Sequence, residues 1–176
     1  MAHTAYPQSY YAASANPVPQ RPALQGEVET DVCIIGAGYT GLSTALFLLE
    51  NGFKVSIVEA AKVGFGASGR NGGQIVNSYS RDIDVIERTV GPKQAQLLGQ
   101  MAFEGGRIIR ERIAKYDIQC DLKDGGVFAA LTSKQMGHLE SQKKLWERYG
   151  HTQLELMDAK RIREVVATEN YVGGML

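Results

Sequence analysis

The pattern of apolar and polar positions first becomes regular near residue 31. Residues 32–35 form a short, continuous apolar run, typical of a strand buried on both faces of a parallel sheet. Residues 39–51 carry apolar side chains at helical spacing, and Gly52 follows where a C-terminal glycine cap belongs. A second apolar run covers residues 55–58. This order predicts a β-α-β unit, whose crossover makes the two strands parallel.

Helical spacing returns after a polar, glycine-rich loop over residues 62–80. A short amphipathic helix is predicted for residues 81–90 and a longer one for residues 92–116, which begins with a proline suited to a first helical turn. The apolar stripe predicted for the longer helix consists of Leu98, Met101, Gly105, Ile109, Ile113 and Tyr116. Gly105 and Gly106 each cost this helix about 1 kcal/mol relative to alanine, so close packing of its backbone is predicted there.

The last third of the chain mixes strand and helix signals. A hairpin is predicted for residues 122–132. Ser133 is the candidate N-cap of a following helix, and Asp158 is the candidate N-cap of a short final helix. Apolar residues and glycines at 171–176 predict one more strand.

The first 28 residues have a different composition and are predicted to form an extended arm. Three prolines disfavour a helix in the arm, namely Pro17, Pro19 and Pro22. A cluster of aromatic side chains indicates that the arm docks on another part of the protein. This cluster consists of Tyr6, Tyr10 and Tyr11.

Composition excludes several classes of partner. Of 176 residues, 44% are hydrophobic and 22% are charged, and 19 Lys and Arg balance 19 Asp and Glu. This balance gives no reason to expect a nucleic acid or a membrane surface as partner. No signal peptide or apolar span is predicted, so a cytoplasmic protein is expected. The two cysteines, Cys33 in the first predicted strand and Cys120, form no C-x-x-C pair, so no metal site is expected.

The candidate chemistry begins with a glycine fingerprint between the first strand and the first helix. The predicted cofactor-binding residues there are Gly36, Ala37, Gly38, Tyr39, Thr40 and Gly41. In such a motif the first glycine permits a tight turn, the second lets a pyrophosphate approach the backbone, and the third lets the helix pack on the strand. The helix N-terminus then offers unpaired N–H groups and the positive end of its dipole to the phosphates.

Glu59 ends the second predicted strand, where a carboxylate accepts hydrogen bonds from ribose hydroxyls. Ala60, next to it, is included in the predicted site. A carboxylate at this position repels a 2′-phosphate, which argues against NADP. The fingerprint alone leaves NAD and FAD open, and a glycine turn without a ligand is the alternative to both.

The glycine-rich loop favours a cofactor that extends beyond the fingerprint. Consecutive backbone N–H groups in such a run can face a ligand, and the interleaved polar residues differ from a flexible Gly/Ser linker. The candidate contacts in the loop are Ser68, Arg70, Asn71, Gly72, Gly73 and Gln74. The alternative is a surface loop without a ligand.

Three stretches make the sequence more specific than a generic dinucleotide-binding domain: residues 9–16 in the arm, residues 66–74 in the loop, and residues 77–82 after it. On these residues the chain resembles the D-amino-acid-oxidase-like family of FAD enzymes. The resemblance implies an α/β fold, in which residues 29–117 form a Rossmann-like FAD-binding part with a parallel sheet. Residues 118–176 would begin an α+β substrate domain. Because family members are more than twice as long, a truncated chain is expected.

The resemblance also implies the chemistry, which is FAD-dependent oxidation of an amine in putrescine catabolism. The implied substrate is a gamma-glutamyl derivative of putrescine, and dioxygen would be reduced to hydrogen peroxide as an aldehyde and ammonia are formed. This chain alone is expected to be inactive. Other amine or amino-acid oxidases and dehydrogenases of the family, and a non-catalytic dinucleotide-binding module, stay open. No catalytic side chain is assigned, because His3, His138 and His151 are not placed beside the fingerprint.

Overall fold

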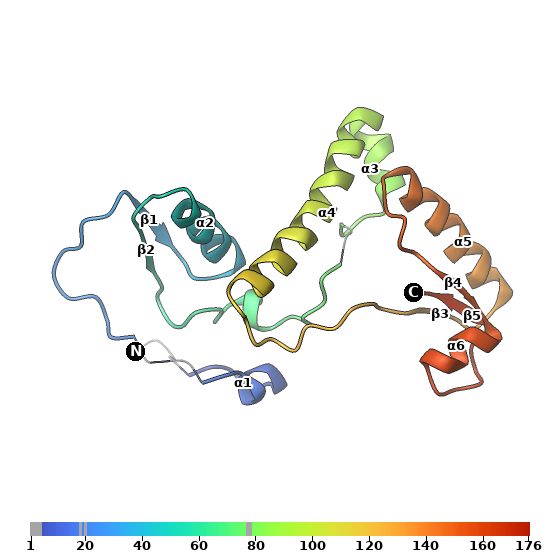
Figure 1. The fold of residues 1–176 in the computed structure, drawn as a ribbon, viewed down its shortest axis with the longest axis horizontal. Coiled ribbons are helices and arrows are strands. Elements are labelled where there is room, and N and C mark those ends of the chain that lie inside the picture. Colours follow the sequence, from blue (N-terminus) through green and yellow to red (C-terminus); the bar gives the residue numbers. More distant parts are fainter. Residues whose placement is uncertain (1–4, 18, 20, 77–78) are drawn as a thin grey trace. The chain divides into compact units, whose positions relative to one another are not determined.

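The computed structural model describes residues 5–17, 19, 21–76 and 79–176. They divide into an N-terminal unit, Met1–Gln74, and a C-terminal unit, Ile75–Leu176 (Figure 1). This division lies earlier than the boundary expected after residue 117, because the two helices that follow residue 80 pack within the C-terminal unit. Where the functional domains of the full-length protein divide stays a prediction.

The N-terminal unit contains the predicted β-α-β unit. Strand β1 (Val32–Ile35) pairs in parallel with strand β2 (Val55–Val58), and helix α2 (Tyr39–Glu50) connects them. Gly52 has a φ of +86°, the left-handed conformation expected of a glycine that ends a helix. The strand, helix and glycine signals are therefore confirmed, with the parallel pairing that the crossover requires.

The burial predicted for the first strand is wrong. Ile35 is 89% exposed and Cys33 is also exposed, although both lie in the continuous apolar run. The sheet has only two strands in the described residues, and α2 contacts both of them. The apolar residues of β1 that point away from α2 therefore have nothing described to pack against.

The arm was predicted to be extended, but part of it is helical. It contains helix α1 (Tyr10–Ser14), whose N-cap Ser9 accepts a hydrogen bond from the Ala12 N–H at 3.2 Å. Pro17, Pro19 and Pro22 do not prevent this helix, because they follow its end. The predicted docking is confirmed, since the Tyr6 hydroxyl donates to the Val63 carbonyl at 2.7 Å.

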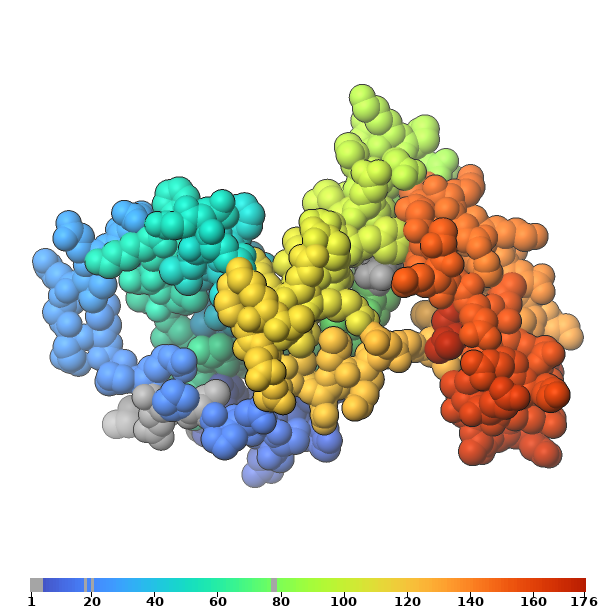
Figure 2. Space-filling view, viewed as in Figure 1, coloured from blue at the N-terminus to red at the C-terminus, as the bar shows by residue number. Residues whose placement is uncertain are grey.

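Three helices build one core of the C-terminal unit, which are α3 (Ile83–Val90), α4 (Pro92–Lys115) and α5 (Ser133–Arg148). The core consists of Ile83, Ala95, Leu145 and Tyr149. The Tyr149 hydroxyl donates a hydrogen bond to the Glu87 carboxylate. Burial and this carboxylate raise the pKa of Tyr149 to about 12. Figure 2 shows α5, in orange, in continuous contact with the redder residues that follow it.

The apolar stripe predicted for α4 is wrong. The buried positions of the helix are its small residues, Ala95, Gly99 and Gly106, while Met101 is 64% exposed. A Cβ on Gly99 would lie 3.1 Å from Cδ1 of Tyr149, so the ring packs directly on the helix backbone. The predicted close packing of the glycine pair applies to Gly106, while Gly105 is exposed.

The predicted hairpin at residues 122–132 is also wrong. Strand β3 (Phe128–Ala130) pairs antiparallel with β5 (Gly173–Met175), which also pairs with β4 (Leu156–Asp158). The central strand lies close to its neighbours, because a Cβ on Gly174 would be 2.8 Å from the Phe128 carbonyl oxygen. Two glycines in β5 therefore favour this pairing of distant segments over a local hairpin.

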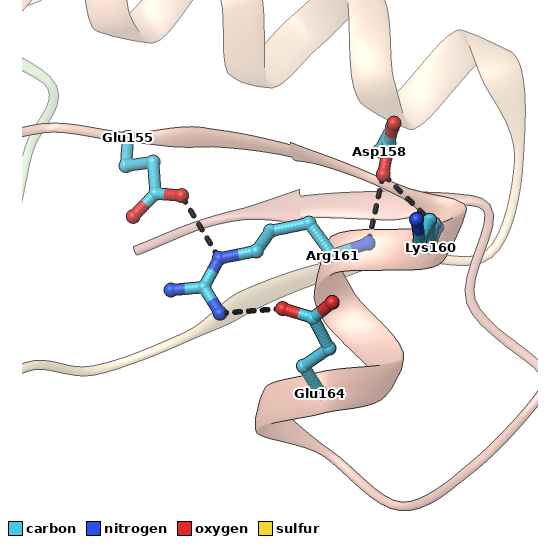
Figure 3. A network of polar contacts seen from close by, with 5 residues as sticks. All are labelled: Glu155, Asp158, Lys160, Arg161 and Glu164. Atoms are coloured by element: carbon cyan, nitrogen blue, oxygen red, sulfur yellow. Dashed lines mark hydrogen bonds and ion pairs between the residues drawn. The ribbon is translucent and has the colours of Figure 1, made fainter.

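Helix caps in this unit follow the sequence closely. The N-cap of α5 is Thr132, one residue before the predicted Ser133, and it forms a capping box with Gln135. Asp158 caps α6 (Ala159–Val165) as predicted, with Oδ1 accepting from the N–H groups of Lys160 at 3.0 Å and Arg161 at 2.8 Å (Figure 3).

Beside this cap, the Arg161 guanidinium bridges Glu155 at 3.1 Å and Glu164 at 2.9 Å (Figure 3). These side chains are 44–56% exposed, so water and salt screen the two ion pairs. The cap is therefore the larger contribution to the stability of α6.

We expect Asp158→Ala to lower the free energy of unfolding by about 1 kcal/mol, because two N–H groups of α6 lose their acceptor. Asp158→Asn, which keeps an acceptor oxygen, should cost less. The measurement is urea unfolding of the full-length protein. Arg161→Gln is the control for the ion pairs and should change stability by less than about 1 kcal/mol. A larger effect for Arg161→Gln than for Asp158→Ala would contradict this ranking.

Candidate functional site

The fingerprint turn is a place where two backbone segments touch. Gly36 follows β1 with a φ of +100°, and its N–H donates to the Val58 carbonyl at 2.8 Å. A Cβ on Gly41 would overlap the Gly36 carbonyl oxygen and lie 3.3 Å from Cγ2 of Ile34. The third glycine is thus required for the contact between α2 and the end of β1, as the motif predicts.

The N-terminus of α2 presents donors instead of a side-chain cap. Its N-cap is Gly38, and the first hydrogen bond of the helix runs from the Leu42 N–H to the Gly38 carbonyl at 2.9 Å. The Tyr39 N–H donates to Oγ of Ser68 at 3.0 Å. The N–H groups of Thr40 and Gly41 cannot bond within the helix. They stand at the positive end of the helix dipole, which favours an anion.

Gly38 places no side chain in front of this helix end, where the Ser68 hydroxyl lies. A Cβ on Gly38 would meet Ser68, at 3.0 Å from Oγ and 3.9 Å from Cβ. A pyrophosphate could therefore approach the backbone here with no side chain of Gly38 in its way, which is the role predicted for the second glycine.

The carboxylate at the end of β2 lies at the same turn. Glu59 accepts hydrogen bonds from the Ala37 N–H at 2.8 Å and from the Ala61 N–H at 2.9 Å. These bonds, the one from Ala37 above all, hold the pKa of Glu59 below its ordinary value. The carboxylate is therefore charged at neutral pH, as an acceptor for ribose hydroxyls needs to be. Its role in holding the turn was not foreseen.

The glycine-rich loop is fastened to the fingerprint. The Gly64 N–H donates to the Ala37 carbonyl at 2.9 Å, and the turn η1 (Ala67–Gly69) carries Ser68 to the end of α2. Within the loop, a Cβ on Gly69 would overlap the Gly64 carbonyl oxygen. The loop is thus closed on itself and bound to the turn, unlike a surface loop without fixed contacts.

Asn71 organises the loop from inside. Its Nδ2 donates to the Tyr39 hydroxyl at 2.9 Å and to the Ser68 carbonyl at 3.0 Å, and its Oδ1 accepts from the Gly73 N–H at 2.8 Å. Both ends of the amide are therefore used within the N-terminal unit. A direct contact of Asn71 with a cofactor stays a prediction, but its internal bonds already give it a positioning role.

The other predicted loop residues lie around this framework. Arg70 donates from Nε to the Gly66 carbonyl at 3.2 Å, and its guanidinium lies 6.0 Å from the centre of the Phe65 ring. Gly73 has a φ of +66°. The side chain of Gln74 lies near Gly72, since its Oε1 would be 3.9 Å from a Cβ on that glycine. Their contacts with a cofactor stay predictions.

None of the histidines is a described residue of the N-terminal unit. His3 lies outside the described residues, and His138 and His151 belong to the C-terminal unit. The ring centres of His151 and Phe103 lie 5.1 Å apart. Burial of the imidazole lowers the pKa of His151. Among the described residues there is no cluster of metal-ligating side chains, and none of the helices there is long and apolar enough to cross a bilayer.

Residues 31–176 match the family described as FAD dependent oxidoreductase. The chain belongs to the FAD-dependent oxidoreductase family. It is 57% identical over 98% of its length to a protein of Escherichia coli strain K12 named gamma-glutamylputrescine oxidoreductase, and it spans 41% of that protein's length. The predicted resemblance to this family is therefore confirmed.

Two solved structures have folds similar to that of the chain. L-proline dehydrogenase from P. horikoshii has a TM-score of 0.60 at 16% identity, covering 84% of this chain and 36% of its own. Glycine oxidase from Bacillus cereus ATCC 14579 has a TM-score of 0.55 at 21% identity, covering 84% and 39%. At these identities they show the shared fold alone, which confirms the predicted α/β class.

FAD is the cofactor of the family, and the fingerprint fits its pyrophosphate. The helix end offers N–H donors, Gly38 adds no side chain in front of it, and the Glu59 carboxylate is charged beside it. These three properties match the negative diphosphate and the hydroxyl-bearing ribose of the AMP half.

Proposed function

We propose that the full-length protein oxidises an amine with FAD, and that residues 31–74 of this chain bind the AMP and pyrophosphate half of the cofactor. The uncapped N-terminus of α2, with Gly38 in front of it and Glu59 beside it, carries the proposal. The 57% identity to gamma-glutamylputrescine oxidoreductase supports the finer assignment. The proposed substrate is gamma-glutamylputrescine, converted with dioxygen and water to gamma-glutamyl-aminobutyraldehyde, ammonia and hydrogen peroxide.

In this proposal bound FAD supplies the redox chemistry, by accepting a hydride from the carbon next to the amine nitrogen. In this proposal the chain described here binds the cofactor and orients it. The backbone between Gly36 and Gly41 holds the pyrophosphate, and Glu59 with Ala60 holds the ribose. The loop from Ser68 to Gln74 would supply further contacts to the cofactor, with Asn71 fixing the shape of the loop.

Other members of the family remain candidates for the exact reaction. Amino-acid oxidases and dehydrogenases share the fold, and the two similar structures favour none of them, because their identities are 16% and 21%. A non-catalytic dinucleotide-binding module is the alternative to an enzyme. A cytoplasmic location stays a prediction, and the oligomeric state stays open.

Two measurements on the purified full-length protein test the proposal. Flavin bands in its absorption spectrum are expected, followed by hydrogen peroxide release when gamma-glutamylputrescine is added in air. If the protein shows flavin bands but releases peroxide with glycine or sarcosine instead, its substrate is that of another type of enzyme in the family. A colourless protein that binds NAD would overturn the FAD proposal.

We expect Glu59→Gln to raise the FAD dissociation constant by about 10- to 100-fold, equivalent to about 1.4–3 kcal/mol. The substitution removes a charged acceptor and turns one acceptor atom into a donor that faces an N–H group. Titration of the flavin-free full-length protein with FAD measures the change. Glu29→Gln, an exposed residue before β1, is the matched control and should leave the constant unchanged. Equal constants for both variants would remove Glu59 from the site.

A further inference from the structure

Tyr6 of the arm makes several contacts with the beginning of the glycine-rich loop. Its hydroxyl donates to the Val63 carbonyl at 2.7 Å. The Lys62 ammonium lies 5.0 Å from the centre of the Tyr6 ring, and the Phe65 ring lies 6.4 Å from it. One residue of the arm thus makes a hydrogen bond, a cation–π contact and a ring contact with one short segment of the loop.

The same segment is bound to the fingerprint from its other side. The Gly64 N–H, in the peptide unit that includes the Val63 carbonyl, donates to the Ala37 carbonyl at 2.9 Å. Both polar atoms of this one peptide group are therefore occupied, one by the arm and one by the turn that is proposed to hold pyrophosphate. A shift of this group would also move η1, because Gly69 packs on the Gly64 carbonyl.

A second aromatic side chain of the arm, Tyr11, lies close to the far end of the loop. Cε1 of Tyr11 lies 4.0 Å from the position that a Cβ on Gly73 would take. Between the two contacts a cavity of about 180 Å³ separates arm and loop, and Arg70 and Phe65 line it on the loop side. The arm therefore contacts the loop near its beginning and near its end.

We propose that residues 5–16 act as a clamp that holds the loop in the shape that binds FAD, with Tyr6 as the main positioning residue. The inference rests on the proposed function, because it concerns the same cofactor site. The fingerprint holds the loop by hydrogen bonds at Gly64, Ser68 and Asn71. Each such neutral bond contributes only about 1 kcal/mol, so loss of the clamp leaves a loop that FAD must order as it binds.

The test compares FAD binding by variants of the full-length protein. Tyr6→Phe keeps the ring contacts and loses the hydroxyl, and we expect the FAD dissociation constant to rise about 5-fold, as for one lost hydrogen bond. Tyr6→Ala loses all three contacts and should raise it about 10- to 50-fold. Leu24→Ala is the control, because Leu24 lies on the arm outside residues 5–16 and is 60% exposed, and it should leave the constant unchanged.

The outcomes separate the clamp from the proposed function. If the wild-type protein binds no FAD, the proposed function fails and the clamp fails with it. If the wild type binds FAD but Tyr6→Ala binds it equally well, the clamp alone is overturned. The melting temperature of the flavin-free protein identifies a merely structural role for Tyr6. Such a role would lower the melting temperature in Tyr6→Ala without a change in the dissociation constant, and that result also overturns the clamp.

Discussion

Gly41→Ala is expected to yield a full-length protein without FAD and with reduced stability. The new Cβ would overlap the carbonyl oxygen of Gly36 and lie 3.2 Å from its carbonyl carbon. Both are backbone atoms, so no side-chain rotation can relieve the overlap. Helix α2 has to move away from β1, which separates the helix N-terminus from the turn that Glu59 holds.

Flavin absorbance per protein after purification measures this loss, and thermal unfolding measures the stability. We expect less than about a tenth of the wild-type flavin content, since the phosphate site of the motif depends on this packing. Gly66→Ala is the matched control, because a Cβ on this loop glycine would meet nothing within 4 Å. A Gly41→Ala protein with full flavin content would show that the contact between α2 and the turn is dispensable.

Gly38→Val is expected to prevent FAD binding while the protein still folds. The Cβ at this position meets only the side chain of Ser68, at 3.0 Å, which can rotate away. The two methyl groups of valine would then occupy the space in front of the helix N-terminus. We expect the FAD dissociation constant to rise more than about 100-fold, because the pyrophosphate loses its approach to the backbone.

Fluorescence titration with FAD and thermal unfolding of the flavin-free protein distinguish this variant from Gly41→Ala. Gly38→Val should unfold near the wild-type temperature, and Gly38→Ala should show an intermediate affinity. If Gly38→Val purified with the wild-type amount of flavin, the pyrophosphate would have to bind somewhere other than this turn.

Sequence signals that involve only a few neighbouring residues predicted the structure well. β1, α2 and β2 were predicted nearly to the residue, because an apolar run, a helical stripe and Gly52 each determine the conformation locally. The Asp158 cap was predicted for the same reason, since its carboxylate reaches N–H groups only two and three residues away.

Predictions that depended on distant partners were less successful. Residues 122–132 contain a turn glycine, but β3 pairs with β5, more than 40 residues later, where glycines permit close approach. In α4 the large apolar side chains suggested the buried face, yet the Tyr149 ring packs on the small residue Gly99. Apolar size along one helix does not show which face a partner will cover.

The candidate site shows the same division. The fingerprint and Glu59 were predicted by spacing, but the hydrogen bond from the Ala37 N–H to the Glu59 carboxylate, 22 residues apart, was not foreseen. The bonds from Ser68 and Asn71 to Tyr39 were not foreseen, because their partners are 29 and 32 residues apart. The contact of Tyr6 with Val63 spans 57 residues, and only the tyrosine cluster indicated that the arm would dock.

The bond between Ser68 and Tyr39 makes the serine a relay. Its oxygen accepts a hydrogen bond from the Tyr39 N–H, so its own O–H can donate a hydrogen bond to an incoming phosphate oxygen. Hydrogen bonds in series polarise one another. The Ser68 hydroxyl therefore extends the positive potential at the N-terminus of α2 beyond the backbone N–H groups. A threonine could keep this chain of donors, whereas an alanine would cut it.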